Sequence, residues 1–184
     1  MSQPAILAFD IAYQSGWAAT GPEGKPVWGH FGVDCEGTNG VGRGLYHFRR
    51  ELYRLIDSRK PQVLAWEMPL PGTKHGARFD DYVRGAVGIL RLAAFELELV
   101  TMACDQKAVR KHFIGDGRPS SEAKQQVWFR CRTLGYLCAN DDESDAIAVL
   151  DYATGVEKVR EYEQKDRARI RRQASRQRPQ AGRL

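Results

Sequence analysis

The stretch Ala5-Ile6-Leu7-Ala8-Phe9-Asp10 is an apolar run that ends in an acid. Its length and composition predict a buried strand over residues 4–12. The run Val63-Leu64-Ala65-Trp66-Glu67 has the same form and predicts a second buried strand. A lone carboxylate at the end of a core strand costs several kcal/mol unless a cation or a donor pairs with it. The two acids therefore predict a shared partner, and a divalent metal is the obvious one.

The segments around these two strands predict the rest of the fold. Apolar patterning predicts further strands over 15–20, 26–33 and 99–103, with a turn at 21–24. Helical spacing predicts long helices over 41–60 and 79–98, shorter ones over 105–114 and 120–134, and a last helix that begins near Asp141. Gly85 and Gly88 inside the second helix predict close packing of another element there. This order is typical of an α/β fold with a five-stranded mixed sheet.

Composition narrows the class of protein. The 184 residues suit one domain, and no apolar run is long enough to span a bilayer. The N-terminus lacks the pattern of a secretory signal, so we expect a soluble cytoplasmic protein that does not bind membranes. The four cysteines form no CxxC pair, which argues against zinc and against a redox dithiol.

The basic charge is concentrated in the last part of the chain. Residues 156–184 hold ten Lys or Arg and four acids, whereas residues 1–155 hold 18 basic and 19 acidic residues. We therefore expect a folded domain over 1–155, followed over 156–184 by a basic helix extension and a flexible tail. Such a tail attracts phosphates non-specifically or serves only solubility.

A second pair of acids opens the last helix. Asp142 and Asp145 are spaced i and i+3, so they share one face of its first turn. A helix packed across the sheet edge would bring them to Asp10 and Glu67. Hard oxygen ligands favour Mg²⁺ or Mn²⁺, and two such ions about 4 Å apart support in-line phosphoryl displacement. Phosphodiester hydrolysis is the reaction that this set favours.

At this point the chain resembles RuvC, the Holliday junction resolvase family of the RNase H-like superfamily. The resemblance covers residues 4–155 and rests on motifs in the family's order: Ile6–Asp10, Ser15-Gly16-Trp17-Ala18, Trp66-Glu67, Arg84-Gly85, Gly115-Asp116-Gly117, Glu122-Ala123-Lys124 and Asp142-Glu143-Ser144-Asp145-Ala146. It implies an RNase H-like fold whose first three strands are antiparallel. A short resolvase with a basic tail also fits a bacteriophage member of the family.

The resemblance also assigns roles to residues. Asp10, Glu67, Asp142 and Asp145 match the four metal-binding acids, with Asp10 expected to contact both ions. Arg110, with Lys111 beside it, takes the place of a catalytic basic residue. An always-charged guanidinium is a poor proton donor, so an electrostatic clamp is the better role for Arg110. The family further implies a homodimer through the 79–98 helix, and products with a 5′-phosphate and a 3′-hydroxyl.

Candidate contacts to DNA fall in several segments. The loop after Glu67 carries two prolines and basic residues that suit a DNA-touching finger, and Leu70 stands where many members have an aromatic residue. The candidates are Leu70, Lys74, His75, Arg78, Arg84, Lys107, Arg118 and Lys124.

The sequence leaves alternatives beside the resolvase hypothesis. A nuclease of the same fold could act with relaxed specificity on branched, flap or fork DNA, or on an RNA–DNA hybrid. A non-catalytic junction-binding protein is a competitor from another class, against which the intact acid set argues. Actin-like ATPases also begin with a strand-end Asp, but they need a second domain for which this chain is too short.

Overall fold

The computed structural model describes residues 4–69, 76–117 and 121–155, and these contain a five-stranded sheet. Its strands are β1 (Ile6–Asp10), β2 (Gln14–Thr20), β3 (Pro26–Gly32), β4 (Val63–Glu67) and β5 (Val100–Cys104), in the spatial order β3-β2-β1-β4-β5. The first three strands pair antiparallel, while β1, β4 and β5 run parallel. The predicted mixed sheet with three antiparallel strands is confirmed. The predicted turn is the short 3-10 helix η1 (Pro22–Gly24).

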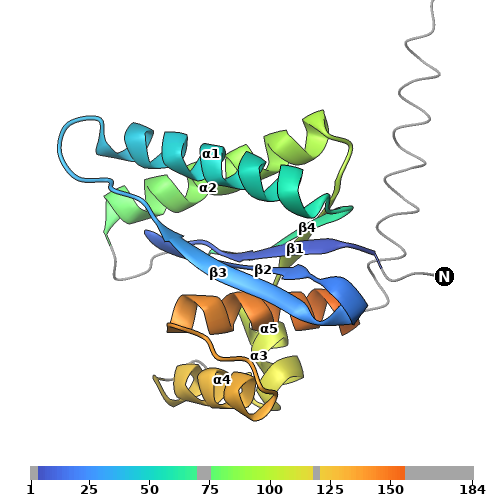
Figure 1. Cartoon of the computed structure of the whole chain (residues 1–184). Helices are drawn as coiled ribbons and strands as arrows, with labels where there is room; N and C mark the ends of the chain where they lie inside the picture. Colours follow the sequence, from blue (N-terminus) through green and yellow to red (C-terminus); the bar gives the residue numbers. More distant parts are fainter. Residues whose placement is uncertain (1–3, 70–75, 118–120, 156–184) are drawn as a thin grey trace, which may run out of the picture.

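Helices cover both faces of the sheet (Figure 1). One face carries α1 (Gly40–Arg59) and α2 (Ala77–Glu96), and the other carries α3 (Gln106–Ile114), α4 (Ser121–Thr133) and α5 (Asp141–Gly155). All five predicted helices are present. The second begins and ends two residues earlier than the prediction of 79–98. No described helix is long and apolar enough to cross a membrane.

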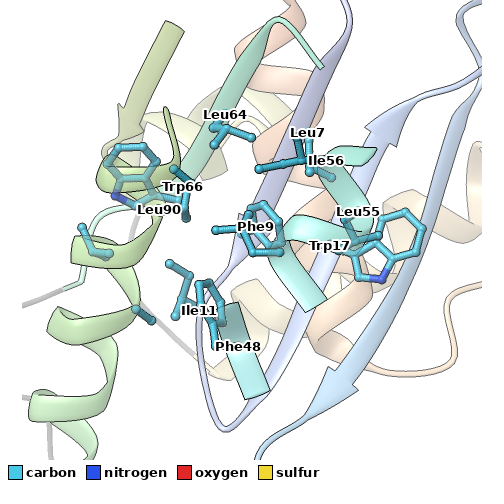
Figure 2. Close-up of a cluster of buried hydrophobic side chains, with 14 of the residues drawn as sticks. Leu7, Phe9, Ile11, Trp17, Phe48, Leu55, Ile56, Leu64, Trp66 and Leu90 are labelled. Atoms are coloured by element: carbon cyan, nitrogen blue, oxygen red, sulfur yellow. The ribbon is translucent and has the colours of Figure 1, made fainter. Parts of the chain in front are cut away.

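Alternation along the strands divides the core into two clusters. Leu7, Phe9, Leu64 and Trp66 point toward α1 and α2 and form the cluster in Figure 2. Ile6 and Ala8 on β1, with Val63 and Ala65 on β4, point toward α5 instead. Because side chains alternate between the two faces of a strand, Asp10 and Glu67 continue the α5 side. The two strand-end acids are thus placed on the same face.

The two glycines of α2 have different surroundings. A Cβ built on Gly85 would lie 2.7 Å from Leu45 Cδ1 of α1, so the predicted close packing occurs there within one chain. A Cβ on Gly88 would meet nothing within 4 Å among the described residues. Within the helix that the resemblance assigns to a dimer contact, Gly85 therefore packs against Leu45 of the same chain, whereas the space beside Gly88 is open among the described residues.

Candidate active site

The carboxyl ends of β1 and β4 meet the start of α5. The strands are parallel neighbours in which Phe9 is paired with Trp66, and Asp10 and Glu67 are the next residues along each strand. On the other side of β1, Asp10 lies opposite Gly16 of β2. A Cβ built on Gly16 would lie only 1.9 Å from the carbonyl oxygen of Asp142. The missing side chain at Gly16 is therefore what lets α5 begin directly over the strand next to Asp10.

A cleft of about 560 Å³ opens at this junction. Its walls combine acidic, amide and basic side chains with apolar residues of α2 and of the segments that follow β1 and β4. The residues that line it include Asp10, Ile11, Ala12, Glu67, Met68, Pro69, Val83, Arg84, Gln106, Lys124 and Asp142. Three of the four predicted acids thus line one cleft, and the fourth, Asp145, lies one helical turn after Asp142.

The four acids interact electrostatically. Burial raises the pKa of Asp10 well above its ordinary value, and the charges of Asp145, Glu67 and Asp142 raise it further. Burial, followed by the charge of Asp145, raises the pKa of Glu67 to about 7. The pKa of Asp145 rises to about 6, chiefly through burial, and burial also raises that of Asp142. The charges of all three other acids therefore act on Asp10.

Two basic side chains, Lys124 and Arg110, oppose this repulsion between the acids. Lys124 Nζ lies 3.8 Å from Asp145 Oδ2, and its charge lowers the pKa of each of the four acids. Arg110 is buried on α3 and lowers the pKa of Glu67 and Asp145. Lys111 is exposed on α3 and does not line the cleft. The structure thus brings Arg110 and Lys124 to the acids and leaves Lys111 at the surface.

The candidate DNA contacts are spread around the cleft. Arg84 lines it, 3.8 Å from Asp80, and Arg78 is exposed at the start of α2. Lys107 is exposed on α3. Four further candidates lie outside the described residues, namely Leu70, Lys74, His75 and Arg118.

The acid set fits a divalent cation in its chemistry. Four carboxylates offer only hard oxygen donors, and burial, together with neighbouring carboxylates, raises the pKa of each. Within the described ranges, no three His, Cys, Asp or Glu side chains form a ready-made ligand shell. Two of the acids have partners in this structure, since Glu67 accepts a hydrogen bond from Gln106 through Oε1 and Asp145 lies 3.8 Å from Lys124 Nζ.

Two features of the site were not predicted from the sequence. Gln106, the first residue of α3, donates through Nε2 to Glu67 Oε1 and holds that carboxylate. Glu143 of α5 is buried and paired with His30 of β3. The sequence near His30 does not indicate this pairing, because Glu143 is 113 residues away.

The raised pKa values predict how stability depends on pH in the absence of metal. The ordinary values of Glu67 and Asp145 are 4.5 and 3.8, so both carboxyls bind a proton more readily in the folded protein than in the unfolded chain. The folded protein therefore loses stability as pH rises through about 6 to 7. In EDTA, thermal denaturation should show a lower Tm at pH 8 than at pH 5.5.

The variant Asp145→Asn should reduce this difference and raise the free energy of unfolding at pH 8 by about 1–3 kcal/mol. Asp81→Asn, at an exposed residue of α2, serves as the control and should leave the pH dependence unchanged. An Asp145→Asn protein with the wild-type pH dependence would contradict the prediction.

The sequence matches no protein-family model and no curated protein. Solved structures, in contrast, resemble the fold closely. Thermus thermophilus RuvC matches with a TM-score of 0.63 and 16% identity over 90% of this chain and 96% of its own. RuvC from the same organism, in complex with a Holliday junction substrate, gives 0.62 and 17% identity over 81% of this chain and 92% of its own. The yeast mitochondrial Holliday junction resolvase gives 0.55 and 8% identity over 90% of this chain and 84% of its own. The chain therefore has the RuvC-like fold.

Proposed function

We propose that this protein is a divalent-metal-dependent endonuclease that resolves four-way DNA junctions by paired nicks. The observation that carries the proposal is that Asp10, Glu67 and Asp142 line one cleft of a RuvC-like fold, with Asp145 one helical turn after Asp142 and close enough for its charge to act on Asp10. One of the similar structures is a complex with a Holliday junction substrate, which supports branched DNA as the substrate here.

The four carboxylates would hold two Mg²⁺ or Mn²⁺ ions, with Asp10 shared between them. Such ions would supply an activated water and stabilise the leaving oxygen, and the products would carry a 5′-phosphate and a 3′-hydroxyl. Each carboxylate must be ionised to bind a cation. Arg110 and Lys124 favour that state for Glu67 and Asp145 because their charges lower both pKa values.

The two basic side chains, Arg110 and Lys124, would interact with the phosphate in different ways. Arg110 is buried and does not line the cleft, so we assign its guanidinium an electrostatic role toward the non-bridging oxygens rather than a direct contact. Lys124 has 49% of its side chain exposed, so it can turn from Asp145 to a phosphate when DNA enters. Arg84, on the α2 wall of the cleft, would contact the backbone of the DNA.

A homodimer would match the two equivalent strands cut in a junction. We assign the contact to α2, where Gly88, Leu92 and Phe95 fall on one exposed face by their i, i+4, i+7 spacing. Leu92 and Phe95 are 53% and 69% exposed, which is unusual for large apolar side chains of one helix face.

A substrate panel tests the proposal. The protein is incubated with a four-way junction, a fork, a flap, a linear duplex and an RNA–DNA hybrid, each with Mg²⁺ and with EDTA. We expect symmetric nicks in the junction only, and none in EDTA. Cutting of forks and flaps at the same rate would favour the relaxed-specificity nuclease, cutting of the hybrid alone would favour a ribonuclease, and no cutting of any substrate would contradict the proposal.

A further inference from the structure

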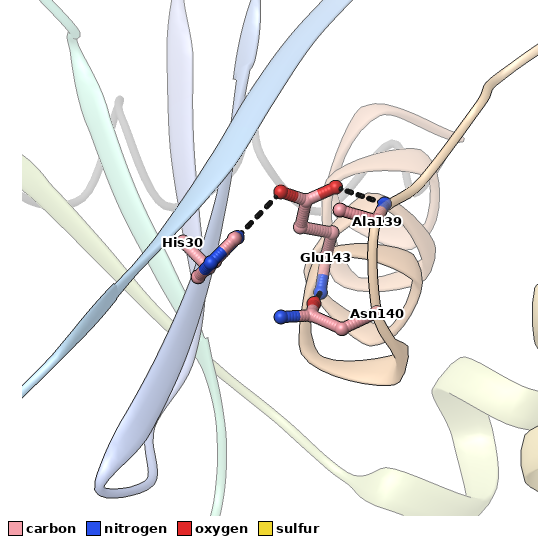
Figure 3. A network of polar contacts seen from close by, with 4 residues as sticks. All are labelled: His30, Ala139, Asn140 and Glu143. Carbon is pink, nitrogen blue, oxygen red and sulfur yellow. Dashed lines mark hydrogen bonds and ion pairs between the residues drawn. The ribbon is translucent and has the colours of Figure 1, made fainter.

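The first turn of α5 is tied to β3 by a buried carboxylate (Figure 3). Glu143 Oε1 lies 2.7 Å from His30 Nδ1, and Glu143 Oε2 accepts a hydrogen bond of 2.7 Å from the backbone N–H of Ala139. The backbone N–H of Glu143 donates to Asn140 Oδ1 at 3.0 Å. Only 7% of the Glu143 side chain is exposed. Both of its oxygens are thus used, one by β3 and one by the segment before α5.

The position of His30 follows from the register of the sheet. Asp10 lies opposite Gly16, and Gly16 lies opposite His30, so the three residues form one row across β1, β2 and β3. Directly opposite residues point to the same face of a sheet. The row therefore places Asp10 and His30 on the α5 side, separated by the glycine over which Asp142 passes.

The same helical turn carries two of the proposed metal ligands. Glu143 lies between Asp142, which lines the cleft, and Asp145, which follows one helical turn later on the same face of the helix. A rigid turn has one orientation, so fixing Glu143 on the β3 side fixes both aspartates. Without the contact between Glu143 and His30, the acids at residues 141, 142 and 145 would repel one another at a helix start that is held by fewer contacts.

We propose that His30 and Glu143 are a positioning pair that sets Asp142 and Asp145 at the distance from Asp10 needed to bind the cations. The inference rests on the proposed function, since it concerns the same carboxylates. Neither residue touches the substrate or a cation. Removal of a group that orients metal ligands typically lowers metal affinity or activity by about 10- to 100-fold.

The experiment compares His30→Ala with His30→Asn, whose amide nitrogen can donate where Nδ1 does. His30→Gln is a third variant, because its amide is displaced by one methylene and it keeps the test available if alanine prevents folding. His112→Ala is the matched control. His112 is also half-exposed and pairs with a carboxylate of α5, Asp151, at 3.1 Å, but at the other end of the helix. Mn²⁺ binding by calorimetry, kcat on the junction, junction Kd and Tm are measured for each.

We expect His30→Ala to bind Mn²⁺ about 10- to 100-fold more weakly and to lose kcat, with an unchanged junction Kd. His30→Asn should recover most of the affinity, His30→Gln less, and His112→Ala should match the wild type in Mn²⁺ binding. Equal Mn²⁺ affinity and kcat in wild type and His30→Ala would overturn the inference. So would an equal loss in His112→Ala, because any weakening of α5 would then suffice. A wild type that binds Mn²⁺ but cuts no junction contradicts the proposed function alone, and the Mn²⁺ affinities still decide the inference.

Discussion

Replacement of Asp10 by asparagine is expected to reduce junction cleavage by roughly 10³-fold or more while leaving the protein folded. In the proposed function Asp10 contacts both cations, and the charges of Glu67, Asp142 and Asp145 all raise its pKa. Asparagine keeps the size of the side chain but removes the charge that holds a hard cation. Because burial raises the pKa of Asp10, the charge is unfavourable to folding and its loss should not lower Tm.

Two measurements separate catalysis from binding in this variant. Junction Kd, measured by gel shift in Ca²⁺ or EDTA, should be unchanged or lower, because a negative charge near the phosphates has been removed. Asp141→Asn is the matched control: Asp141 opens the same helix beside Asp142, but it is exposed and does not line the cleft. It should cleave at close to the wild-type rate. Cleavage by Asp10→Asn at the wild-type rate would contradict a catalytic role for these acids.

The second large effect is expected from Gly16→Ala. The added Cβ would lie 1.9 Å from the carbonyl oxygen and 2.3 Å from the carbonyl carbon of Asp142, and both are backbone atoms. β2 is held between β1 and β3, so α5 would have to retreat by ~1.5 Å to restore van der Waals contact. A displacement of that size at a catalytic group can cost about 10²-fold in rate, and overpacking costs about 1–3 kcal/mol of stability.

Gly42→Ala is the control for this substitution. Gly42 lies in α1, is exposed, and has nothing within 4 Å of a Cβ built on it. Alanine there should raise the free energy of unfolding by about 0.5–1 kcal/mol, without an effect on cleavage. Urea denaturation and Mg²⁺-dependent nicking are measured for both variants. Unchanged stability and rate in Gly16→Ala would mean that α5 does not need its close approach to β2.

Most of the secondary structure could be predicted from the sequence because the signals are local. The apolar run that ends in Asp10 predicted a buried strand with an acid at its end, but the continuous apolar pattern did not show which side of the sheet Asp10 faces. Pro61 indicated the C-terminal end of α1, and the glycines and proline at 21–24 indicated the turn between β2 and β3. The start of α2 was placed two residues late, because Ala77 and Arg78 carry no apolar signal and the preceding cap is Gly76 with a positive φ of 86°.

The candidate site was only partly predictable. Its four acids follow from strand ends and from i, i+3 spacing, which are properties of short segments. The residues that contact those acids cannot be predicted in this way, because they come from distant parts of the sequence. Gln106 reaches Glu67 from 39 residues away, and nothing in its own neighbourhood marks it as a partner of an acid.

The sequence by itself determined the order of strands and helices and the location of carboxylates at their ends, because periodicity and turn chemistry are encoded within a few residues. Only the tertiary structure decided which neighbours surround the acids. The contact of Gly16 with Asp142 and the pairing of His30 with Glu143 depend on the register of three strands and on where α5 crosses them. Those are set by packing of the whole core, and no local pattern of residues carries them.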